Sequence, residues 1–555
     1  MPTDEMNFQE YSRAVAARFL QTAVVLDDKA FLDIPNTNDI RDIITEGKIR
    51  GKSVILKSPG INTVSTSSHD LNAKVLIDSF AKKGLICGVL RPDPGDSLEK
   101  NMLNIAKRAD IVILDWQIHN SGDITKGIIK NIVDSELGNN ERLRLISVYT
   151  AENDPVAILE QIAGAINVTN PDKDNLTMSL GAVKITIFLK EGLKGKVNKK
   201  FEPMIISESE LPETLIREFS EMTSGLLSNC ALESFAIIRN NTHRILQKFH
   251  STLDAPYLTH RILTEPADEA ELHITPLIVS EIHSVLENED LSKHVSPSLI
   301  EKWLDNFIHT SDPPLHKRMK IKSKKDAKTA MLELISKGLR HENASHNHKA
   351  WDNFLKPIKD NDGDIRKMKK ALNQLSNIIT PDNASGLRYD RELALLMSIR
   401  SRYQTPPPVL KLGTVVAEDN NGTVSYLLCV QPLCDSVRID SGGREFTFLK
   451  MPLTNGKYFG YIVKDKEQIV ELRINMRPHD AIKIKFKPGS LKMICAVKHC
   501  EEWIFEYNGT KSVRKKLRWI ADLKADYAQR VANDYAREIS RVGLTESEWL
   551  RRHNK

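Results

Sequence analysis

The stretch ADIVILDWQ, residues 109–117, places an aspartate directly behind four strongly apolar residues. The run IVIL (111–114) shows no alternation with polar residues, which is the pattern of a strand covered on both faces. Asp115 follows at the point where this strand would leave the core. Functional groups of open parallel sheets collect at the carboxyl ends of the strands, so a carboxylate at this position suggests a site rather than an accident of folding.

Four more apolar runs accompany this strand in the first third of the chain. They are TAVVL (22–26), LICGVL (85–90), LRLISVY (143–149) and KITIFL (184–189). Segments with helical spacing, such as AKVLIDSFAKKG and DPVAILEQIAGAI, lie between them. Apolar strands that alternate with helices predict an α/β domain over residues 1–200, with a parallel sheet covered by helices on both faces.

The rest of the chain has a different pattern. Residues 205–400 have helical spacing and predict a mainly helical middle domain, which ends near the run QTPPPVL because consecutive prolines cannot continue a helix. Residues 408–507 contain short β-type runs between turn signals and predict a β-rich domain. Residues 511–555 have helical periodicity. The predicted fold class is therefore a multidomain protein of α/β, α and β parts, ending in helices.

Polar side chains of matched types follow the strands of the first domain. Asp27 and Asp28 follow the first strand, Asp115 the third, Thr150 the fourth and Lys190 the fifth. Carboxylates that converge at one edge repel one another unless a cation lies among them, and a site made of oxygen ligands suits Mg²⁺. A carboxylate beside Mg²⁺ can attack a phosphoryl group, while a lysine and a hydroxyl bind its oxygens. The pattern predicts a phosphoacceptor site.

This set of residues resembles the receiver domain of two-component response regulators, which is a (βα)5 doubly wound fold. The resemblance implies that Asp115 is phosphorylated by a sensor histidine kinase, that Thr150 is the switch hydroxyl and that Lys190 binds the phosphoryl group. It also implies that Asp27, Asp28, Asp115 and the backbone carbonyl of Gln117 hold Mg²⁺. The sequence departs from the family pattern in an insertion at about residues 31–72, in a polar insertion before the fifth strand, and in Glu191, where the family has proline.

The insertion and the large C-terminal part resemble the divergent receivers of bacterial anti-phage operons, in particular those of the Detocs system. This resemblance implies a kinase of the same operon as phosphoryl donor and a second, receiver-bearing effector as competitor. The chain would then be a phosphate buffer that prevents accidental activation, with slow autodephosphorylation at most and no enzymatic output. The alternative is an output protein whose C-terminal domains bind nucleic acid or another effector when Asp115 is phosphorylated. An enzyme of unrecognised type in the last 350 residues ranks third.

Composition limits the other possibilities. The net charge of +6 over 555 residues does not indicate a nucleic-acid partner, and we interpret the basic runs at 316–328 and 366–370 as solvated helix faces. No apolar run is long enough for a membrane span, so we expect a cytoplasmic protein. Two Cys-x4-Cys pairs and a histidine-rich stretch raise the question of zinc, but buried free thiols and a polar loop are the favoured interpretations. These residues are Cys429, Cys434, Cys495, Cys500, His341, His346 and His348.

Overall fold

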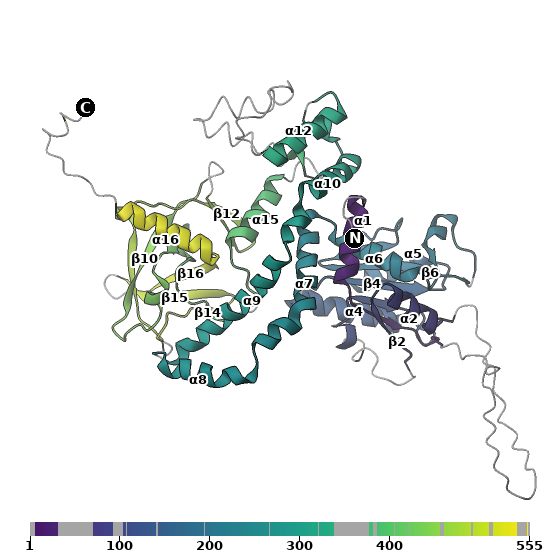
Figure 1. Cartoon of the computed structure of the whole chain (residues 1–555), viewed down its shortest axis with the longest axis horizontal. Helices are drawn as coiled ribbons and strands as arrows, with labels where there is room; N and C mark the ends of the chain where they lie inside the picture. The colour runs from purple at the N-terminus through teal and green to yellow at the C-terminus, as the bar shows by residue number, and fades with distance from the viewer. Residues whose placement is uncertain are drawn as a thin grey trace, which may run out of the picture. The chain divides into compact units, whose positions relative to one another are not determined.

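The computed structural model describes two compact units, residues 1–306 and 307–555. Within them it describes residues 6–31, 70–92, 101–193, 195–337, 377–380, 386–403, 406–454, 460–509, 514–540 and 552, with gaps of one or two residues inside several ranges. Figure 1 draws the first unit in purple to teal and the sheet of the second in green to yellow. No helix among these residues is long and apolar enough to cross a membrane.

The first unit is built around a mostly parallel sheet. Its strands are β1 (Thr22–Leu26), β2 (Ile86–Leu90), β3 (Ile111–Leu114), β4 (Arg144–Thr150), β5 (Thr177–Leu180), β6 (Val183–Lys190) and the short β7 (Ile205–Ile206). The order is β2-β1-β3-β4-β6-β5, with β7 paired to β6. Only β5 runs antiparallel to its neighbour. The strand order reverses between β1 and β3, and in sheets of this kind such a point opens a crevice for ligands.

Two groups of helices cover the two faces of this sheet, as the sequence predicted. α4 (Gly122–Asn139) and α5 (Pro155–Ala165) pack against the side chains of Val112, Leu114 and the alternate residues of β4 and β6. α1 (Phe8–Phe19) and α2 (Ala73–Lys82) lie on the other face with α6 (Leu211–Thr223) and the start of α7 (Leu226–Lys248). The apolar strands are therefore buried on both sides, which confirms the predicted parallel sheet.

The helices after residue 205 do not form one body. Leu211, Leu215 and Phe219 of α6 are fully buried against the first sheet, so this part of the region predicted as a helical middle domain extends the α/β core. The unit continues through α8 (Asp254–Leu263) and α9 (Ile274–Asn288) into α10 (Pro297–Thr310). α11 (Leu315–Arg318), α12 (Lys324–Lys337) and α15 (Gly386–Ser398) belong to the second unit. The exact domain boundaries stay predictions.

A seven-stranded antiparallel sheet dominates the second unit, in agreement with the predicted β-rich region. Its strands are β8 (Thr414–Asn420), β9 (Thr423–Cys429), β10 (Arg444–Met451), β13 (Ile482–Phe486), β14 (Val497–His499), β15 (Glu502–Asn508) and β16 (Arg514–Asp522). The order is β13-β10-β9-β8-β16-β15-β14, and β11 (Tyr461–Asp465) with β12 (Gln468–Leu472) forms a separate hairpin. α16 (Ala525–Ile539) packs on one face through Ala528 and Val531.

One secondary-structure prediction in this unit was wrong. The run RKKLRWIAD was assigned to the C-terminal helices, but it is β16, which pairs with β8 and β15. Leu517, Ile520 and Ala521 are spaced like the apolar face of a helix. A shift of register between Trp519 and Ala521 explains this spacing, because a bulge interrupts the alternation of a strand.

Candidate functional site

The candidate site lies where β1, β3, β4 and β6 end. Asp27 and Asp28 follow β1, Asp115 follows β3, and β1 and β3 are neighbours at the point of strand reversal. The Asp115 N–H donates to the Leu26 carbonyl over 2.9 Å, which extends the β1–β3 pairing as far as the site. Parallel pairing therefore holds the positions of Asp27 and Asp115 side by side, because the register of the buried strands fixes where each strand ends.

Lys190 joins the two carboxylates. It is the last residue of β6, and its Nζ lies 2.6 Å from Asp27 Oδ2 and 2.8 Å from Asp115 Oδ1. All three residues are buried, with exposed fractions of 2% for Asp27, 8% for Asp115 and 6% for Lys190. The structure thus brings together three residues that are more than 70 positions apart in sequence. Charge-assisted bonds of this length in a buried setting hold the side chains in one arrangement.

Burial and charge act on this group in opposite directions. Burial lowers the pKa of Lys190, but Asp115 and Asp27 outweigh it, so the lysine pKa is raised and the ammonium stays charged. Burial raises the pKa of Asp27 and repulsion from Asp115 adds to the rise, although Lys190 opposes both. Two carboxylates share one ammonium here, which leaves the group one positive charge short of neutrality. A cation is therefore electrostatically favoured at this place.

Asp28 has a different environment from its neighbour. Its Oδ2 accepts a hydrogen bond of 2.8 Å from the His119 backbone N–H, and His119 Nδ1 lies 3.5 Å from the same oxygen. Its Oδ1 is buried and has no hydrogen-bond partner among the described residues, and the same holds for His119 Nε2. An unpaired buried carboxylate oxygen fits a cation ligand. No local pattern in the sequence indicates His119, whose backbone φ of 50° turns the loop back toward Asp28.

Thr150 and Tyr149 end β4 beside the site. Thr150 is buried, and its Oγ1 accepts a hydrogen bond of 3.2 Å from the Glu152 N–H. The Tyr149 hydroxyl donates to the Ile206 carbonyl over 2.8 Å, and its ring lies 5.7 Å from Lys190 Nζ. Burial raises the pKa of this phenol, so it remains a donor at neutral pH. Ile206 also pairs with Lys190 through β7, so the strand that precedes α6 contacts both residues.

The loop after Asp115 is tied back to the core. Gln117 donates its backbone N–H to Asp115 Oδ2 over 2.9 Å, and the Thr125 hydroxyl donates to the Asp115 carbonyl over 2.8 Å. Trp116 is 4% exposed and packs in the core with α4. A Cβ at Gly122 would lie 2.6 Å from the Trp116 ring. Only glycine therefore lets α4 begin this close to the loop.

A shallow cavity of about 260 Å³ opens beside Lys190. Asp70, Tyr149, Glu191 and Glu208 line it together with Val75, Ser207 and Ser209. Glu208 accepts the Asn72 N–H over 2.8 Å, and burial raises the pKa of its carboxyl group. The cavity is polar, and three of its lining residues, Asp70, Glu191 and Glu208, are acidic. Small anionic donors would meet these carboxylates as they approach.

Comparison with known proteins agrees with this geometry. Residues 19–194 match the family model of the response receiver domain. The match spans β1 to β6 and includes every predicted site residue, and it covers about a third of the chain. No curated protein and no solved structure matches the chain. The match agrees with the parallel sheet and suggests phosphoryl acceptance in two-component signalling. Receiver domains in general interact with histidine kinases and bind Mg²⁺ at the phosphorylation site.

Several predicted features lie elsewhere or outside the described residues. Most of the insertion at 31–72 and all three histidines of the 341–348 stretch are outside them. Among the residues that are described, no three His, Cys, Asp or Glu side chains are arranged as a ready metal site. Cys429 is buried, Cys495 half-buried, and Cys434 and Cys500 exposed, all as free thiols. The polar insertion before β6 contains a strand that the sequence analysis missed, β5, which pairs along β6.

Proposed function

We propose that the chain is a cytoplasmic phosphoacceptor of a bacterial two-component system, with Asp115 as the residue that takes the phosphoryl group from a histidine kinase. The observation that supports this most is Lys190 Nζ held between Asp27 and Asp115 at the strand ends. An Asp115 oxygen attacks the phosphorus, a P–O bond forms and the P–N bond to the kinase imidazole breaks. Lys190 then moves from the carboxylate to the new phosphoryl oxygens, and the Thr150 hydroxyl donates to another.

The site supplies the oxygen ligands that magnesium prefers, although its three aspartates are not arranged as a ready metal site. Asp27 and Asp115 face a common positive charge, and Asp28 has an unpaired buried oxygen, so these carboxylates with the Gln117 carbonyl would hold Mg²⁺. The ion would offset the negative charge of the incoming group. Once Mg²⁺ is held by the aspartates, Lys190 is no longer required as their only counter-charge. The ion would thereby release the ammonium for the phosphoryl oxygens.

The proposed role of the phosphorylated protein is that of a buffer. By the resemblance to Detocs receivers, the chain would take up phosphoryl groups that would otherwise reach a second receiver, the effector. The acidic residues Glu191 and Glu208 beside Lys190 support selective loading, since they disfavour small anionic donors over a docked kinase. We expect slow loss of the phosphoryl group and no other chemical activity.

The alternative, an output protein that binds nucleic acid, finds less support in the second unit. A groove over β8, β15 and β16 carries basic residues, but Lys515 pairs with Glu418 and Arg518 pairs with Asp465. A phosphate backbone needs unpaired positive charge. Salt-dependent binding of a DNA or RNA duplex that changes on phosphorylation would favour this alternative over the buffer.

The deciding experiment measures intact mass after incubation with Mg²⁺ and either acetyl phosphate or a phosphorylated histidine kinase. The wild type should gain one alkali-labile phosphoryl group, and Asp115→Asn should gain none. Asp110→Asn is the matched control, because Asp110 precedes the same strand and bonds to Thr22 at the opposite end of the sheet. If neither donor phosphorylates the wild type, the phosphoacceptor proposal is wrong. If the wild type is phosphorylated, buffering is tested next by adding a second receiver, whose phosphorylation the wild type should reduce and Asp115→Asn should not.

A further inference from the structure

The helical arm formed by α7, α8 and α9 exposes far more apolar surface than a folded domain usually leaves to water. α8 and α9, both described over their whole length, contain no buried residue. Ile262 and Leu263 are 80% and 79% exposed. The exposed large apolar side chains between residues 246 and 279 are Leu246, Phe249, Leu253, Leu258, Ile262, Leu263, Ile274, Leu277, Ile278 and Val279. So many exposed large apolar side chains on neighbouring helices are typical of an interaction site.

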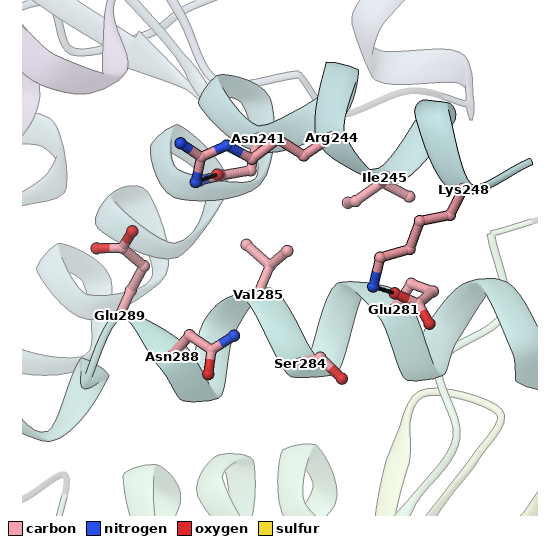
Figure 2. A pocket seen from close by; sticks show the side chains of 9 residues that line it. All are labelled: Asn241, Arg244, Ile245, Lys248, Glu281, Ser284, Val285, Asn288 and Glu289. Carbon is pink, nitrogen blue, oxygen red and sulfur yellow. Dashed lines mark hydrogen bonds and ion pairs between the residues drawn. The ribbon is translucent and has the colours of Figure 1, made fainter.

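The arm also fails to fill its own interior. α7 and α9 run antiparallel, and Figure 2 shows side chains of both helices pointing into the gap between them. The gap is an open groove of about 190 Å³ whose lining is mostly polar and charged, with Ile245 of α7 and Val285 of α9 as its apolar members. Two helices alone cannot enclose an apolar core, whereas four can.

The charges of the two helices are opposite. Residues 239–248 of α7 contain three Arg or Lys and no Asp or Glu, and residues 280–290 contain four Asp or Glu and no Arg or Lys. These stretches lie across from each other, where Lys248 and Glu281 form an ion pair. A second copy rotated by 180° would place α7 of each arm against α9 of the other. Within one arm these charges already face each other, and a twofold arrangement of two arms would bring the same basic and acidic stretches together again.

We propose that the chain dimerises through this arm, with two α7–α9 hairpins forming a four-helix arrangement. Stable interfaces bury roughly 800 Å² on each partner, and ten large apolar side chains, most of them about half exposed, can supply most of that area. The interface involves no residue of the phosphoacceptor site, so the proposal does not depend on the proposed function.

The test is the molar mass of the full-length protein by sedimentation equilibrium over a range of concentrations. The wild type should be a dimer, and Ile262→Glu with Leu263→Glu should raise the dissociation constant at least about 30-fold, the effect of losing one central interface residue. Ile86→Glu is the matched control, because Ile86 is 73% exposed on β2 in the same unit, away from the arm. It should leave the dimer unchanged.

Charge reversal provides a second variant that keeps the apolar surface. Arg244→Glu should weaken the dimer, and combining it with Glu289→Lys across the cavity should restore part of the affinity. Circular dichroism of each variant checks that the helices remain folded. A monomeric wild type at all concentrations, or a dimer that Ile262→Glu with Leu263→Glu leaves intact, would overturn the proposal.

Discussion

Replacing Lys190 by methionine removes the charge that joins the two site aspartates while keeping most of the length of the side chain. Asp27 and Asp115 would then lie buried and close together without a counter-charge, since both bind the same Nζ at 2.6 Å and 2.8 Å. We expect Lys190→Met to destabilise the receiver domain at neutral pH in the absence of divalent cations. We also expect Mg²⁺ to recover part of the loss, because it can take over the neutralisation of the carboxylates.

The size of the effect follows from burial. The side chains of Lys190, Asp27 and Asp115 are 7%, 3% and 9% exposed, so water can screen little of the remaining repulsion. Breaking a buried ion pair by removing one partner costs about 3–5 kcal/mol of unfolding free energy. When the pKa of a carboxyl group is higher in the folded than in the unfolded state, the charged group destabilises the fold. The full loss of stability is present above the folded-state pKa, and no loss remains below the unfolded-state pKa. The loss should therefore shrink as the pH falls toward 4.

Native-state hydrogen exchange measures this effect in one domain of a large protein. Peptides that cover β1 and β3 report the opening free energy of the sheet beneath the site, whereas a global unfolding curve would mix the two units. Lys173→Met is the matched control, since Lys173 forms an exposed pair with Glu160 in the same unit and should cost at most about 1 kcal/mol. A change below about 1 kcal/mol for Lys190→Met, or no response to Mg²⁺, would refute the electrostatic reasoning.

Three further predictions concern other parts of the chain. Arg144→Met should lower the unfolding free energy of the first unit by about 3–5 kcal/mol, because Glu136 is left buried without its partner at 2.8 Å. Hydrogen exchange of β4 measures this loss, and adding Glu136→Leu should restore part of it. The Nδ1 of His294 lies 2.5 Å from the Tyr11 hydroxyl, and burial lowers the pKa of this imidazole. The free energy of unfolding should therefore fall as the pH drops below about 6.5, where the unfolded histidine takes up a proton. His294→Leu should flatten this pH dependence in hydrogen-exchange measurements on α1. Gly443→Ala should destabilise the second unit by at least about 2 kcal/mol in thermal unfolding. The φ angle of Gly443 is 80°, and a Cβ there would lie 2.3 Å from the Phe486 carbonyl oxygen. Gly442→Ala is the control, because its Cβ would point into open space and the change should be neutral.

The first sheet was predictable from the sequence because its strands are buried on both faces. Continuous apolar runs such as those ending at Leu26 and Leu114 have no other common interpretation when helices separate them. The contact of Asp27, Asp115 and Lys190 followed from the same reasoning, since parallel strands end at one edge. The direction of Asp28 did not follow, because adjacent residues after a strand point to different sides and the partner, His119, depends on the path of a loop.

Segments whose structure depends on distant pairing were not predictable. β5 has only four residues, and it is a strand because the outer edge of β6 offers free backbone groups. The Tyr149 hydroxyl finds the Ile206 carbonyl from a position 57 residues away, which no local pattern indicates. Helices α6 and α7 have the same amphipathic spacing whether they form a separate domain or cover a sheet. Only the packing of Leu211, Leu215 and Phe219 distinguishes these possibilities.

The burial of α6 on the receiver sheet limits how this chain can be divided. A truncated protein that ends with the family match at residue 194 would lack the segment that pairs with β6 and the helix that covers Tyr149 and Phe188. That protein would present an apolar sheet face to water and would be prone to aggregate. The same packing protects the chain after residue 205 from proteases. Limited digestion should therefore release a stable fragment that includes α6 rather than one that stops at the end of β6.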